Sequence, residues 1–102
     1  MSKHPFLMNS KETEILNILQ EECAELIQMV SKCRRFGIDQ QHLKADKPNR
    51  VKLTEEIGDV LAMINLCIRY NIVDQTDVIV AQENKFKKLK EWSTIFEQEN
   101  EN

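Results

Sequence analysis

The expected fold depends most on one stretch of the sequence, Leu53-Thr-Glu-Glu-Ile-Gly-Asp-Val-Leu-Ala-Met-Ile-Asn-Leu-Cys-Ile-Arg-Tyr70. From Val60 to Ile68 only Asn65 is polar, and a helix that is apolar nearly all round is expected to be buried. Its first turns nevertheless carry Glu56 and Asp59, which point the same way because they are three residues apart. Since burying an unpaired carboxylate is costly, we expect a positive group in front of these two acids.

A second acid pair lies in the first half of the chain. Apolar side chains there recur at steps of four and three, a pattern typical of a helix that packs on another helix: Ile15, Leu19, Leu26, Met29 and Cys33. Glu22 occupies an apolar position of this pattern, and Glu25 follows three residues later. Acids are rare at such positions, so Glu22 and Glu25 are candidates for a site, although a Glu-x-x-Glu pair alone is most often a solvated helix face.

The composition predicts an all-α domain. Only two glycines and two prolines occur in 102 residues, and helix-forming side chains are abundant. We expect an N-terminal arm at residues 1–9, one domain at residues 10–92 and a polar tail at residues 93–102. The domain has three helices, at about 10–36, 47–70 and 75–92, the second capped by Asp46. A chain this short buries a modest core, so we expect oligomerisation to complete a larger, four-helix-type bundle.

Charge and cysteine usage restrict the possible partners and compartment. The chain has 14 basic and 17 acidic side chains, a net charge of −3, so a nucleic-acid-binding surface is not expected. Three cysteines at helical positions are typical of reduced thiols. The apolar run is too short for a membrane span, and the N-terminus does not resemble a secretory signal. We therefore expect a cytoplasmic protein that binds neither nucleic acid nor membrane.

The two acid pairs can form one site if the first two helices are antiparallel. Glu22, Glu25, Glu56 and Asp59 would then supply four carboxylates and no histidine. An all-oxygen site suits Mg²⁺, or Mn²⁺, completed by water or phosphate oxygens. A di-iron carboxylate bundle is the rival interpretation, but it expects Glu-x-x-His on two helices, and both His4 and His42 lie outside the helical patterns.

These motifs resemble a known family. Glu21-Glu22-Cys-Ala-Glu25 followed by Glu56-Ile-Gly-Asp59 looks like the paired motif of the MazG-like, all-α nucleoside triphosphate pyrophosphohydrolases. Asn84-Lys-Phe-Lys-Lys-Leu89 is similar to the lysine-containing stretch of that family. The resemblance covers roughly residues 12 to 90, and the gap between the two acidic motifs is somewhat longer than is common in the family.

The resemblance implies a Mg²⁺-dependent enzyme that cleaves an NTP or dNTP to the monophosphate and pyrophosphate, and a homodimer or homotetramer. Glu22, Glu25, Glu56 and Asp59 would bind the metal, and Glu21 would orient or deprotonate the attacking water. Basic side chains would stabilise the leaving pyrophosphate. The candidates are Lys85 and Lys88, with Lys32 and Arg35 behind them.

Base choice stays open, because the sequence has no match to the N-terminal base-binding segment of the dCTP pyrophosphatase branch of the family. Two alternatives also remain. One is a phosphoribosyl-ATP pyrophosphohydrolase, which uses similar acidic helices. The other is a non-catalytic helical interaction module, whose acids would form salt bridges to the lysines of a partner.

Overall fold

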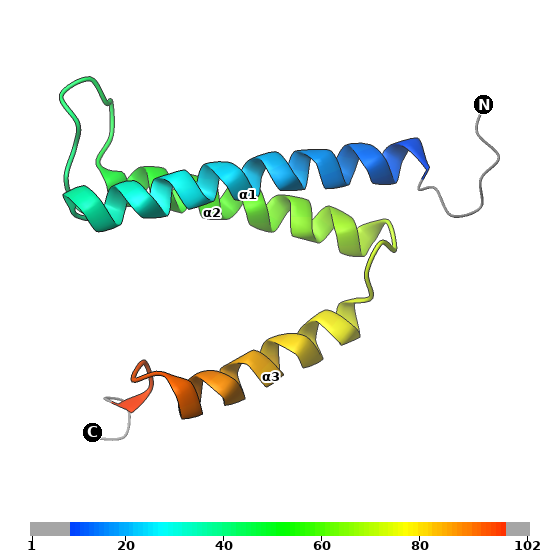
Figure 1. Cartoon of the computed structure of the whole chain (residues 1–102). Coiled ribbons are helices and arrows are strands. Elements are labelled where there is room, and N and C mark those ends of the chain that lie inside the picture. The colour runs from blue at the N-terminus through cyan, green and yellow to red at the C-terminus, as the bar shows by residue number, and fades with distance from the viewer. Residues whose placement is uncertain (1–8, 98–102) are drawn as a thin grey trace. The chain divides into compact units, whose positions relative to one another are not determined.

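The computed structural model describes residues 9–97, and this part of the chain consists of three α-helices without strands (Figure 1). Helix α1 spans Ser10–Phe36, α2 spans Asn49–Arg69 and α3 spans Gln75–Trp92. The predicted all-α class is therefore confirmed. The expected N-terminal arm lies almost wholly outside the described residues, as does the end of the expected tail. Within residues 9–97, no helix is long and apolar enough to cross a membrane.

Local side-chain chemistry fixes both ends of α1. Asn9 Oδ1 accepts a hydrogen bond from the backbone N–H of Glu12 at 2.8 Å, and Asn9 Nδ2 donates to Glu12 Oε1 at 2.9 Å. This reciprocal pair satisfies a backbone donor that the first helical turn leaves free. The helix ends at Gly37, whose φ of 102° favours glycine and whose N–H donates to the carbonyl of Cys33.

Helix α2 begins two residues later than the sequence predicts. Pro48 is its N-cap, and the carbonyl of Pro48 accepts hydrogen bonds from the N–H groups of Val51 and Lys52. Asp46 does not cap the helix; its carboxylate lies 3.9 Å from the ammonium of Lys52. Because the residue before a proline avoids the helical conformation, a helical start at position 47 is disfavoured.

The core lies between α1 and α2, which run side by side as an antiparallel pair (Figure 1). Ile15 of α1 packs with Met63 and Cys67 of α2. The prediction that α2 is buried all round is wrong for the single chain, because Ile57 is 43 % and Leu61 58 % exposed. Within the first unit, α1 covers only one face of α2.

The chain divides into two units, the first ending at Ile72 and the second beginning at Val73. In the second unit, Asp74 caps α3 by accepting a hydrogen bond from the N–H of Asp77 at 3.1 Å. Phe86 packs edge-to-face on Phe96, with ring centroids 6.4 Å apart. All the acids of the predicted site belong to the first unit.

Candidate metal centre

Three of the four predicted metal ligands converge from two helices. Glu22 of α1 and Glu56 and Asp59 of α2 each offer a carboxylate oxygen, and these oxygens all lie within 4.8 Å of one another. Glu22 is seven residues from both Ile15 and Met29, which are buried, so the helical repeat turns its side chain toward α2. Glu56 and Asp59 share a face of α2 because they are three residues apart.

Two of these acids have a buried oxygen without a partner. Oε2 of Glu22 and Oε2 of Glu56 are inaccessible and form no hydrogen bond. Within residues 9–97, no salt bridge joins Glu22, Glu56 or Asp59 to a basic side chain. Buried polar atoms normally have partners, so the two orphan oxygens indicate that a cation or a donor from outside the chain completes the group.

The environment raises the pKa of Glu22 and Glu56, which are both half-buried. Burial is the largest cause of the raised pKa of Glu22, and the negative charges of the neighbouring acids, led by Glu25, raise it further. Burial is also the largest cause of the raised pKa of Glu56, followed by the charges of Glu25 and Asp59. Crowded like charges in partial burial oppose ionisation, and a divalent cation would reverse that balance.

The remaining acids of the first motif, Glu21 and Glu25, are exposed beside this group. Glu25 is exposed and, unlike Glu22, is not one of the three converging acids. It lines a neighbouring pocket together with Glu56. Glu21 is exposed next to Glu22. Gly58, between Glu56 and Asp59, has no atom of the described residues within 4 Å of where a Cβ would lie, so α1 does not use the space it leaves.

The pocket beside the acids brings cations close to them. Its volume is about 440 Å³, and it lies between α1 and the beginning of α2. The side chains that line it are Glu25, Gln28, Met29, Lys32, Asp46, Lys52, Glu55 and Glu56. Lys32 was a sequence-based candidate for phosphate binding, whereas sequence reasoning missed Lys52. The sequence did contain a signal for Lys52, because Lys52 lies four residues, or one helical turn, before Glu56.

The other predicted basic residues lie elsewhere. Arg35 does not line this pocket; its guanidinium lies over the ring of Phe36, 5.1 Å from the ring centroid. Lys85 and Lys88 are exposed on α3, in the second unit. Phosphate binding by these three residues stays a prediction.

The donor set of the three converging acids fits a hard divalent cation. The ligands are all carboxylate oxygens, which Mg²⁺ prefers, and no imidazole or thiolate of the kind that selects zinc or copper takes part. Oε2 of Glu22 and Oε2 of Glu56, which have no hydrogen-bond partner, are available as ligand atoms in the same group. Glu22, Glu56 and Asp59 would therefore hold the ion, and Glu25, whose charge raises the pKa of both Glu22 and Glu56, would join them.

Comparison with known proteins agrees with this geometry. Searches of curated proteins and of solved structures gave no match. Residues 10–93 match the family model described as the MazG nucleotide pyrophosphohydrolase domain, and the matched range contains both acid pairs and the pocket between the helices. Because the match covers most of the sequence, the chain belongs to the MazG nucleotide pyrophosphohydrolase family.

Proposed function

We propose that this protein hydrolyses a nucleoside triphosphate, ribo- or deoxyribo-, to the nucleoside monophosphate and pyrophosphate, with Mg²⁺ as the cofactor. The observation that carries the proposal is the group formed by Glu22, Glu56 and Asp59, with two buried oxygens that lack a partner. Such a group is costly without a cation. The adjoining pocket, about 440 Å³ in volume, carries Lys32 and Lys52 among its acidic side chains.

The proposed reaction breaks one phosphoanhydride bond. The oxygen of a water attacks the α-phosphorus, the bond to the α–β bridging oxygen breaks, and pyrophosphate leaves. When bound, Mg²⁺ would offset the charge of the triphosphate and make the attacking water more acidic. Glu22, Glu25, Glu56 and Asp59 hold the ion in this proposal.

Side chains around the acids supply the remaining roles. Glu21, exposed beside Glu22, accepts the proton of the water or orients it. Lys32 and Lys52 line the same pocket as Glu25 and Glu56, and in this proposal their ammonium groups share charge with the leaving pyrophosphate. Lys85 and Lys88 remain further candidates for this role.

A second copy of the chain completes the domain in the same proposal. Ile57 and Leu61 are exposed on α2, within one turn of Asp59, and leaving large apolar side chains in water is unfavourable. We expect a homodimer or homotetramer in light scattering after size-exclusion chromatography, and dissociation in the Leu61→Glu variant. A wild-type monomer at micromolar concentration would contradict this part of the proposal.

The activity test uses Mg²⁺ and each common NTP and dNTP in turn, with pyrophosphate and the monophosphate as the readout. Glu22→Gln and Asp59→Asn should abolish the release of both products. Glu14→Gln is the matched control, because Glu14 is an exposed acid of α1 that lies outside the three-acid group.

The pattern of results separates the alternatives. Silence toward every nucleotide together with a clear stabilisation by Mg²⁺ would redirect the test to phosphoribosyl-ATP. Silence without any effect of Mg²⁺ on the melting temperature would refute the metal site and favour the interaction module.

A further inference from the structure

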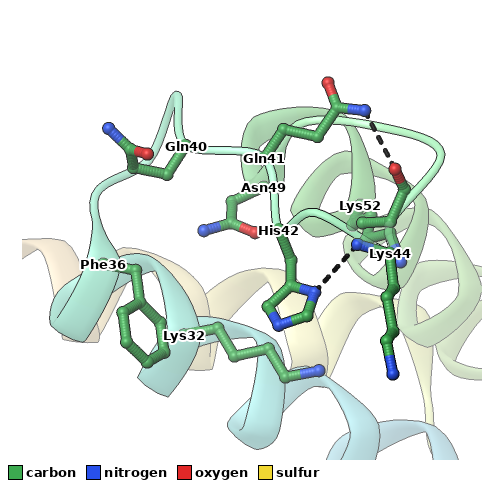
Figure 2. Close-up of a pocket in the computed structure, with 9 residues that line it drawn as sticks. Lys32, Phe36, Gln40, Gln41, His42, Lys44, Asn49 and Lys52 are labelled. Carbon is green, nitrogen blue, oxygen red and sulfur yellow. Dashed lines mark hydrogen bonds between the residues drawn. The ribbon is translucent and has the colours of Figure 1, made fainter.

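A second pocket opens at the end of the hairpin where α1 and α2 are joined (Figure 2). Its volume is about 480 Å³, within the range of small-molecule sites. The side chains that line it are Lys32, Phe36, Gln40, Gln41, His42, Lys44, Ala45, Asn49 and Lys52. Lys32 and Lys52 also line the acidic pocket, so the two pockets adjoin through these two lysines.

The lining of this second pocket suits a flat aromatic ligand. The surface it offers is mainly apolar, and Phe36 is 61 % exposed although it is a large aromatic side chain. Figure 2 shows Phe36 and Lys32 extending from α1 and the imidazole of His42 turned toward α1 from the connecting loop. Aromatic rings are the usual stacking partners of nucleobases, and a few polar groups around them read the base edge.

The loop that forms one wall is held in place by several contacts. Asn49, which is buried, donates from Nδ2 to the carbonyl of Gly37 at 2.9 Å, and its N–H donates to the carbonyl of Gln40 at 2.8 Å. Arg50 forms a two-point hydrogen-bonded ion pair with Asp39, at 2.8 and 3.1 Å. These contacts fix both ends of the loop, so the pocket wall exists before a ligand arrives.

The hydrogen bonds within the loop also determine which donor and acceptor atoms the loop offers to a ligand in the pocket. The backbone N–H of Lys44 donates to Nδ1 of His42 at 3.1 Å, so Nδ1 is the accepting ring nitrogen and Nε2 is the one that donates. Nε2 of Gln41 donates a hydrogen bond to the carbonyl of Ala45 at 2.9 Å, which leaves Oε1 of Gln41 as an acceptor for a ligand. The loop therefore supplies one donor and one acceptor beside the exposed ring of Phe36.

We propose that this pocket binds the nucleobase of the substrate, with the base stacked on Phe36 and its edge hydrogen-bonded by His42 and Gln41. The proposal rests on the function proposed above, because it takes the phosphates to lie at the acids. Lys32 and Lys52 then stand between base and metal, where the triphosphate passes. A phosphate tail in the second pocket is the weaker alternative, because an anion gains nothing from the Phe36 ring or the apolar lining.

The test compares a nucleotide with a ligand that has no base. Binding is measured calorimetrically in Mg²⁺ for non-hydrolysable α,β-imido analogues of the common nucleoside triphosphates and for inorganic tripolyphosphate. The wild type should bind its best nucleotide analogue more tightly than tripolyphosphate. Phe36→Ala should weaken the binding affinity for the nucleotide analogue about tenfold, the usual effect of losing one stacking partner. The affinity for tripolyphosphate should stay unchanged. Phe36→Trp should restore the nucleotide affinity.

Leu43→Ala is the matched control, since Leu43 is on the same loop, is fully exposed and does not line the pocket. Truncating Phe36 should not unfold the chain, because its side chain is mostly exposed. If Phe36→Ala binds the nucleotide as well as the wild type does, or loses both ligands equally, the base pocket is wrong although the proposed function stands. If the wild type binds neither ligand and releases no pyrophosphate, the proposed function fails and the base pocket with it.

Discussion

Replacing Glu22 by Gln should make the metal-free protein more stable at neutral pH. The amide keeps the volume of the side chain and removes one negative charge from a group whose oxygens lie within 4.8 Å of one another. Burial and neighbouring acids raise the pKa of Glu22 above its ordinary 4.5, so the folded state opposes its ionisation more than the unfolded chain does. The penalty is absent below pH 4.5 and grows as the pH rises through the folded-state pKa.

The effect of Mg²⁺ should have the opposite pattern. A ligand that binds only the folded state at 100 times its Kd stabilises by about 2.7 kcal/mol. For a domain of this size each kcal/mol is worth about 4–8 °C, so the wild-type melting temperature should rise by about 10–20 °C. Glu22→Gln should lose most of this shift, because one of the three converging carboxylates is gone.

Thermal unfolding followed by circular dichroism, at pH 4 and pH 7.5, with EDTA or with Mg²⁺, measures both effects. Glu14→Gln should melt like the wild type under all four conditions. A Glu22→Gln protein that is less stable than the wild type in EDTA at pH 7.5 would refute the reasoning, because Glu22 would then have a favourable partner. So would a wild-type melting temperature that Mg²⁺ does not move.

Three further outcomes are expected. Met29→Ala should destabilise the fold by about 2–5 kcal/mol, because Met29 is 5 % exposed, whereas Ile27→Ala, at a position 69 % exposed, should be nearly neutral in urea unfolding. Lys52→Met should lower kcat/KM for pyrophosphate release about tenfold, the worth of one hydrogen bond to a charged group. An unchanged kcat/KM would remove Lys52 from the phosphate site. Gly58→Ala should stabilise α2 by up to about 1 kcal/mol, because the added Cβ meets no atom within 4 Å. Gly37→Ala should destabilise, because its φ of 102° strains any other residue; equal melting temperatures for the two variants would contradict this contrast.

Local periodicity allowed the sequence to predict the helices and the orientation of the acids. Glu56 and Asp59 lie on one face of any helix that contains them, and the position of Glu22 among apolar side chains turns it toward the neighbouring helix. The all-α class follows in the same way from the scarcity of glycine and proline. These inferences need only the helical repeat, which is a property of the chain over a few residues.

The packing of α1 against α2 decides which of the predicted acids come together, and the helical repeat alone does not contain this information. Glu22 and Glu25 are both predicted ligands, and the register of α1 against α2 brings an oxygen of Glu22 to within 4.8 Å of oxygens of Glu56 and Asp59. Glu25 lines the adjoining pocket, and its negative charge acts on both Glu22 and Glu56. The axial register of two packed helices depends on which side chains interlock, and the spacing along one helix does not contain that information.

The loop between α1 and α2 shows most clearly which features the sequence predicts and which features depend on the tertiary structure. The sequence predicts helices at about 10–36 and 47–70 and no regular structure for the residues between them. The contacts of Asn49 and Arg50 with the loop, and the convergence of Phe36 and His42 on one pocket, join residues that no local pattern relates. Acids and helices could be predicted from the sequence because neighbours along the chain determine them. The pocket needed the tertiary structure, because hydrogen bonds between residues about twelve positions apart fold the loop back onto the helix ends.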